Sequence, residues 1–386
     1  MLETKAVFAI ITGILLVFVG LYSGRSKGTV LIISGTFVRK KVNMKYFIIF
    51  FFFWIFAICV TDSNDLSNYR YAYNSRISHD KEPLFDIVRF FFHDQGWSFD
   101  DFKLIWVTLV LILLYIAIKK YSETPSAVAA LALITPLTGF ITQMRSALAG
   151  AIVLNAFSLI LTGKKKDRVW YCIIIILSAQ IHITAYAFLI FLFIKPKENR
   201  TFRTLYYVII AVITLIALLF STFYMQTIYN VFNALPISGN NAVRVLSYFQ
   251  GEGVHFRYAF FLLCKHLFLF FLTNKACEIQ IKEGHYENTE IPRYRMICEA
   301  NKLMLLFLPI TIISASFERL FNCFILIQYV VVFNVGNSKV LLFKRISWKK
   351  SLQSLMIIGI LFFTSIELYF SSDDMVRILN SIQWPF

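Results

Sequence analysis

Charged side chains are scarce in this sequence. Asp, Glu, Lys and Arg make up only 16% of its 386 residues, whereas 58% are hydrophobic. Soluble domains carry about 25% charged residues, so the composition excludes an ordinary soluble protein. We predict an all-α, polytopic membrane protein in which residues 1–386 form a single transmembrane domain.

The sequence also lacks the motifs of several common site types. Its six cysteines are scattered and form no Cys-x-x-Cys pair, so neither a disulfide framework nor a zinc site is indicated. No Ser-His-Asp spacing, HExxH motif, P-loop or Gly-x-Gly-x-x-Gly occurs, which leaves a hydrolase, a zinc protease and an ATPase without support. We therefore predict no metal and no cofactor.

The net charge of +16 has a membrane explanation and does not point to nucleic acid. The Lys and Arg residues lie in short clusters between apolar runs, and form no groove or helical stripe. Such clusters mark the cytoplasmic loops of membrane proteins. They predict a protein with both termini outside and with no nucleic-acid partner.

Apolar runs divide the chain into about twelve candidate spans, some of them short, because crossing the hydrocarbon takes roughly 20 helical residues. The run at 169–194 has basic clusters before and after it, so we expect it to turn inside the membrane. The candidates are 6–22, 46–60, 104–118, 125–142, 146–162, 169–179, 183–194, 204–224, 258–273, 303–316, 320–335 and 352–370.

Three connecting segments are long enough to matter for function. The outer segment 61–103 is rich in Asp and Glu, and two of its stretches, 65–71 and 84–92, favour short amphipathic helices on the outer membrane face. The outer segment 225–257 carries glycines and a proline typical of a flexible loop that could act as a lid. Residues 274–302 are expected to form a cytoplasmic loop.

Three basic side chains stand at the outer ends of apolar runs, where a charge needs a partner. Arg145 either snorkels to lipid phosphate or holds a diphosphate, which the planar guanidinium suits. His182 is either an interior histidine bonded to a hydroxyl such as Thr184, or a phosphate or sugar ligand in a cavity. Arg319 either pairs with its neighbour Glu318 or converges with the other two on an anion.

Short pieces spread along the chain resemble the EpsG-like family, bacterial polysaccharide polymerases of the Wzy kind. They are an Asp-x-x-x-Tyr, a Glu-Pro-Leu-Phe, an Arg that opens a helix rich in small residues, an embedded His one hairpin later, and a late Arg before an aromatic-rich span. The corresponding residues are 65–69, 82–85, 145–149, 180–182 and 319–324.

The resemblance implies a GT-C-like enzyme of the bacterial cytoplasmic (inner) membrane with its active site facing the exterior or periplasm. Its substrate would be oligosaccharide units on undecaprenyl diphosphate, joined into O-antigen, capsule or another surface polysaccharide. Membrane lipid would surround it, and a chain-length regulator protein could be a partner.

The same resemblance implies roles for single residues. Asp65 would activate the acceptor hydroxyl, with Glu82 as the second choice. Arg145, His182 and Arg319 would hold the diphosphate, because developing negative charge needs fixed cations. Further sugar or lid contacts are expected from Tyr69, Arg70, Arg244 and Arg257.

Two other functional classes remain open. A flippase or secondary transporter for lipid-linked polysaccharide also needs buried charges that face a cavity, although no internal repeat is visible in the sequence. A ligase or acyltransferase acting on the same glycans would differ only in its acceptor.

Overall fold

The computed structural model describes residues 44–78, 82–194, 200–219, 256–283, 291–313, 317–335, 346–370 and 372–382, with single positions at 13, 14, 17 and 21. Within these residues the fold is helical, which confirms the predicted class; the only β-type pairing there is an isolated bridge between Val60 and Ile382. Apart from these four single positions, the apolar run at 6–22 lies outside the described residues, as does most of the segment 225–257, including Arg244.

The described helices follow one another along the chain. In order they are α2 (Met44–Cys59), α3 (Asn64–Asn74), α4 (Pro83–Asp94), α5 (Phe99–Tyr121), α6 (Pro125–Ile134), α7 (Leu137–Thr142), α8 (Met144–Leu161), α9 (Lys165–Ala179), the 3-10 helix η1 (Ile183–Phe193), α10 (Arg200–Leu219), α13 (Phe256–Glu283), α14 (Ile291–Met304), η3 (Leu305–Phe307), α15 (Leu308–Ile313), α16 (Glu318–Asn334), α17 (Ile346–Phe370) and α18 (Ser372–Asn380).

Four described stretches are long and apolar enough to cross a membrane, at Phe99–Tyr121, Met144–Leu161, Arg257–Lys282 and Ser351–Tyr369. Shorter apolar helices accompany them, among them α2, α6 and η1. The chain is thus a multi-pass membrane protein. The expectation of about twelve spans is not confirmed.

Two of the predicted elements have different bounds. The run 125–142, expected as one span, is divided into α6 and α7 at Pro136, which has no N–H to continue the ladder of helical hydrogen bonds. The segment 274–302, expected as a cytoplasmic loop, is helical wherever it is described, because α13 runs on to Glu283 and α14 begins at Ile291.

Helix α16 lies at the centre of the packing. Nearly all its residues are buried, and it contacts α13, α6, α8 and α17. The contact with α8 is close because Gly150 faces Cys323 with no room for a side chain. Helix α8 in turn packs between α5 and α9, and Trp106 and Tyr121 of α5 donate hydrogen bonds to α8 carbonyls at 2.8 and 2.7 Å.

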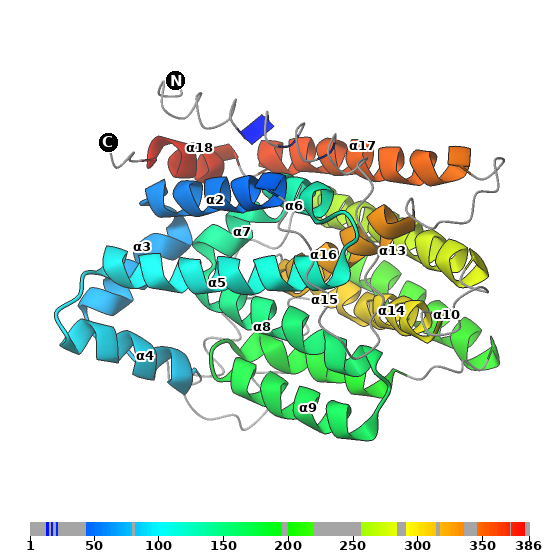
Figure 1. Ribbon diagram of the computed structural model, residues 1–386, viewed down its shortest axis with the longest axis horizontal. Helices are drawn as coiled ribbons and strands as arrows, with labels where there is room; N and C mark the ends of the chain where they lie inside the picture. The colour runs from blue at the N-terminus through cyan, green and yellow to red at the C-terminus, as the bar shows by residue number, and fades with distance from the viewer. Residues whose placement is uncertain are drawn as a thin grey trace.

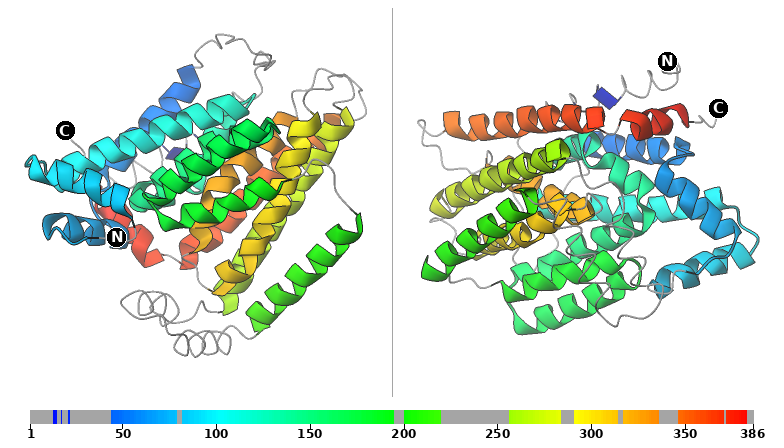
Figure 2. Two further views of the ribbon diagram at one scale, coloured as in Figure 1. Left: turned by 90° about the horizontal axis from the view of Figure 1, so that it is seen from below. Right: turned by 180° about the vertical axis from the view of Figure 1, so that it is seen from behind.

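The segment 61–103 forms the two amphipathic helices that its sequence predicts, α3 and α4, side by side at one end of the bundle (Figures 1 and 2). Ser63 caps the start of α3, and Ser98 and Asp101 form a capping box at the start of α5. The last helix, α18, lies at the same end, where Arg377 pairs with Asp62 at 2.7 Å.

Candidate active site

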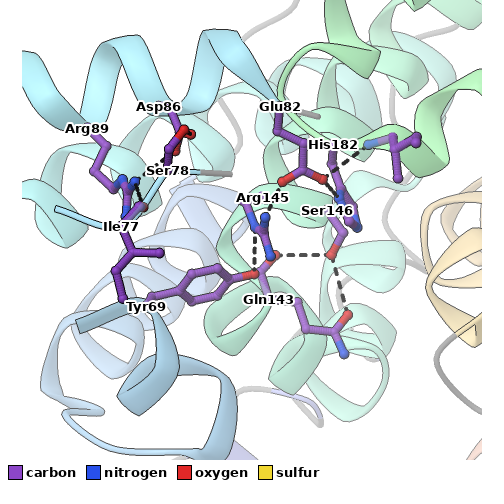
Figure 3. Close-up of polar contacts among 11 residues, drawn as sticks. Tyr69, Ile77, Ser78, Glu82, Asp86, Arg89, Gln143, Arg145, Ser146 and His182 are labelled. Atoms are coloured by element: carbon purple, nitrogen blue, oxygen red, sulfur yellow. Dashed lines mark hydrogen bonds and ion pairs between the residues drawn. The ribbon is translucent and has the colours of Figure 1, made fainter. Parts of the chain in front are cut away.

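Glu82 is the residue on which the candidate site is centred. It precedes Pro83, the first residue of α4, but its side chain does not cap that helix. Instead the carboxylate turns inward and contacts Arg145 with one oxygen and His182 with the other (Figure 3). The residue is only 4% exposed. A buried carboxylate is costly unless it is paired, and here both of its oxygens are.

Arg145 occupies the first turn of α8, where the helix dipole disfavours a positive charge. Its guanidinium is compensated by Glu82, 63 residues earlier in the chain, and its Nε donates to the Tyr69 hydroxyl at 3.3 Å. It also lies over the rings of Tyr69 and Phe85, at 5.1 and 5.6 Å from their centroids. These contacts replace the lipid phosphate that a snorkelling arginine would seek.

His182 lies in the turn between α9 and η1 and is 6% exposed. Its Nδ1 is 2.5 Å from Glu82 Oε1, and the Ile183 amide donates to the same oxygen at 3.3 Å. Its partner is therefore Glu82, not the hydroxyl of Thr184. The turn is fastened to α4, because the Leu84 amide donates to the Gln180 carbonyl at 3.1 Å.

The charges around Glu82 determine its protonation. Burial raises the pKa of Glu82, but the hydrogen bond from His182 and the positive charge of Arg145 outweigh this effect and lower the pKa from 4.5 to about 2. Glu82 is therefore an anion at neutral pH. This carboxylate is held by fixed partners at the junction of three chain segments.

A second contact joins α3 to α16. Arg319 approaches Asp65 at 3.4 Å across 254 residues of sequence, with side chains 19% and 33% exposed. Asp65 and Tyr69 are one turn apart on α3, so this contact adjoins the one at Arg145. The sequence allowed Glu318 as the plain partner of Arg319. In the structure Glu318 pairs elsewhere.

The actual partner of Glu318 is Lys265 of α13, at 2.7 Å. Lys265 also contacts Glu367 of α17 at 2.8 Å, and only 3% of its side chain is exposed. This triad was not predicted from the sequence. Its signal was present, since Lys265 and Glu367 are charges inside apolar runs, and such charges usually have a buried partner.

The remaining sequence-predicted residues lie away from Glu82 or cannot be placed. Arg70 pairs with Asp100 at 2.9 Å on the outer segment, and Arg257 is exposed at the start of α13. Asp86, another carboxylate of this segment, forms a buried ion pair with Arg89 at 2.8 Å. Among the residues that the structure describes, no cluster of three or more His, Cys, Asp or Glu could hold a metal ion.

The helices and this site define a multi-pass membrane protein with a buried carboxylate, arginine and histidine cluster at one end of the bundle. The chain belongs to the EpsG family, whose model matches residues 42–380, and EpsG is a family of Wzy-like polymerases. The match covers every residue of the site and confirms the predicted family. Neither the curated proteins nor the solved structures give a match to the chain.

Proposed function

We propose that this protein is a membrane glycosyltransferase that joins oligosaccharide units carried on undecaprenyl diphosphate into a surface polysaccharide. The observation that carries the proposal is the buried contact of Glu82 with Arg145 and His182 in a member of a polymerase family. Ionisable groups with strongly shifted pKa values gather at functional sites, and the pKa of Glu82 is one of these.

The chemistry needs fixed positive charge near the leaving diphosphate. In glycosyl transfer the bond from the anomeric carbon to the phosphate oxygen breaks, and the electron pair leaves with the diphosphate. Arg319 and Arg145 can each offer a planar pair of N–H donors to phosphate oxygens. Preorganised donors of this kind lower the barrier because they need no rearrangement during the reaction.

The resting contacts suggest an order in which the two arginines engage the substrate. Arg145 is closely held by Glu82, whereas the Arg319 contact with Asp65 is 3.4 Å long and more exposed. An arriving diphosphate therefore displaces the carboxylate of Asp65 first, since that exchange costs less. Arg319 is the first anchor in this proposal, and Arg145 follows as the sugar settles.

The position of the site supports an outward-facing reaction. The polar helices α3 and α4 lie at the same end of the bundle as Glu82. The lysine-rich turn that joins α8 to α9 lies at the other end of α8, away from Glu82 (Figure 1). Under the positive-inside rule the lysine turn is cytoplasmic. We therefore assign the active site to the exterior face of the cytoplasmic membrane, in a GT-C-like bundle.

The test is polymer formation by the purified protein from one lipid-diphosphate oligosaccharide. The wild type should convert it to a ladder of longer glycans with no second protein. Arg319→Ala should lower the rate by about 10²-fold or more, the usual cost of one donor to a developing anion, and Arg319→Lys should retain part of it. Arg76→Ala is the matched control, because Arg76 pairs with Asp94 at 3.0 Å on the exposed outer surface.

The outcomes separate the alternatives. No ladder from the wild type refutes a polymerase, and equal rates in wild type and Arg319→Ala refute the site. Movement of the lipid-linked unit across a vesicle without lengthening would instead identify a flippase. Product formed only with a different acceptor would identify a ligase.

A further inference from the structure

One ring nitrogen of His182, Nε2, takes no part in the contact with Glu82. Its Nδ1 faces Glu82 at 2.5 Å, but its Nε2 is buried and has no hydrogen-bond partner among the residues that the structure describes. A buried polar atom without a partner costs about 1–3 kcal/mol, so most such atoms find one. An orphaned nitrogen beside two arginines and an ion-paired carboxylate points to a group that arrives with the substrate.

The partner of Nδ1 fixes the state of the ring. Glu82 is ionised, and an ionised carboxylate can only accept hydrogen bonds. Nδ1 must therefore carry the proton, and in the neutral imidazole the lone pair lies on Nε2. A carboxylate that holds a histidine in this tautomer is the arrangement by which serine hydrolases keep their base ready.

We propose that His182 is the general base that takes the proton from the acceptor sugar hydroxyl, and that Glu82 positions it. This inference rests on the proposed function and assigns His182 a role other than holding phosphate. Asp65 is the weaker candidate for the base, because its carboxylate contacts Arg319 at 3.4 Å, whereas Nε2 of His182 has no hydrogen-bond partner in the described part of the chain.

The proposed step forms one glycosidic bond and breaks one bond to the lipid diphosphate. The acceptor oxygen forms a bond to the anomeric carbon of the donor, and the bond from that carbon to the diphosphate oxygen breaks. The electron pair of the broken bond leaves with the lipid diphosphate. The hydroxyl proton moves to Nε2, which makes an imidazolium held by Glu82, and it passes later to water or to the diphosphate.

Charged groups from several elements face His182 and set the balance of its two states. Burial disfavours the imidazolium most; Glu82, ahead of α4, favours it, and Arg145 of α8 and Arg319 of α16 disfavour it further. A base flanked in this way can take a proton in the transition state and then release it. If His182 instead held phosphate, it would need to be protonated before the substrate bound.

These two roles predict opposite dependence on pH. The experiment measures kcat for ladder formation by the full-length protein between pH 4 and 9, because burial disfavours the imidazolium and moves the rising limb to low pH. A general base requires neutral imidazole, so kcat should rise with pH to a plateau. A phosphate ligand requires imidazolium, so the rate should fall as pH rises. A falling profile therefore overturns the proposal, while absence of product at every pH would refute the polymerase itself.

Two substitutions decide between the candidate bases. His182→Gln should lower kcat by about 10²-fold or more, change KM little and abolish the rising limb. Asp65→Asn should retain the limb. The matched control is His93→Gln, because His93 is a partly exposed histidine of α4 beside Asp94, and this variant should keep the wild-type profile.

Two results would overturn the assignment of His182 as the base. The assignment fails if His182→Gln keeps kcat within threefold of the wild type, or if Asp65→Asn alone removes the rising limb. Thermal unfolding of each variant shows whether a lost rate reflects lost structure. A variant that melts like the wild type yet has a flat profile supports the base.

Discussion

Replacing Lys265 by Met tests how the bundle tolerates charge at its centre. Lys265 lies on α13 and bridges Glu318 of α16 and Glu367 of α17 at 2.7 and 2.8 Å. Methionine has a similar length and no charge. The substitution therefore leaves two carboxyl groups facing each other with no cation between them.

The cost follows from the burial of these side chains. The exposed fractions are 3% for Lys265, 11% for Glu318 and 29% for Glu367, so water compensates little of the lost pairing. Removing one partner of a buried ion pair costs about 3–5 kcal/mol. Unfolding 386 residues at about 2.1 cal/mol/K each gives about 0.8 kcal/mol/K, so the melting temperature should fall by roughly 4–6 °C.

The assay is thermal unfolding of the purified full-length protein in detergent. Lys275→Met is the matched control, because Lys275 lies on the same helix with 59% of its side chain exposed, and it should melt like the wild type. A triple variant with Met at 265 and Gln at 318 and 367 should recover most of the loss, since it leaves no uncompensated charge. A Lys265→Met protein as stable as the wild type would refute the reasoning.

Two further predictions concern packing and pH. A Cβ added at Gly150 would lie 1.8 Å from Cys323 Sγ, so Gly150→Ala should lower the stability measured by thermal unfolding by about 1–3 kcal/mol. Adding Cys323→Ala should restore the lost stability. If the double variant is no more stable than Gly150→Ala, the clash with Cys323 is not the cause of the loss. Because the pKa of Glu82 falls from 4.5 to about 2, its ionised form stabilises the fold by on the order of 3 kcal/mol above pH 4.5, and this is lost as pH falls toward 2. The stability gap between wild type and Glu82→Gln should therefore shrink on acidification, and a gap that stays constant would contradict this.

Composition and apolar runs were enough to predict the helical membrane class, because they depend only on the solvent that each segment tolerates. The two outer helices were also predictable, since the residues around Leu66 and Phe85 repeat with helical spacing. The exact ends of the helices were harder to predict. The break at Pro136 has a local cause, the missing N–H of proline, but the extension of α13 past Thr273 depends on neighbouring helices, which the local sequence does not encode.

The sequence drew attention to polar residues of the candidate site that needed partners, but it did not predict which residues would pair. Arg145 and His182 stood out as charges that needed partners, and both find one in Glu82, which was only the second choice for a catalytic carboxylate. The contact of Arg319 with Asp65 spans 254 residues. Pairings of this kind arise from how helices pack, so neighbouring sequence pointed to Glu318 instead.

The charge balance of the site connects the two proposals. At rest, the positive charges of Arg145 and Arg319 are balanced by the negative charges of Glu82 and Asp65. The net charge of the site is therefore small before a diphosphate binds. In the proposed reaction, the proton that His182 takes from the acceptor hydroxyl adds a positive charge to the site as negative charge develops on the leaving diphosphate. Electrostatic stabilisation is then strongest in the transition state, which is where it accelerates the chemical step. A carboxylate base would raise the charge of the site by the same one unit, so the feature that favours His182 as the base is its buried Nε2, which has no partner among the described residues.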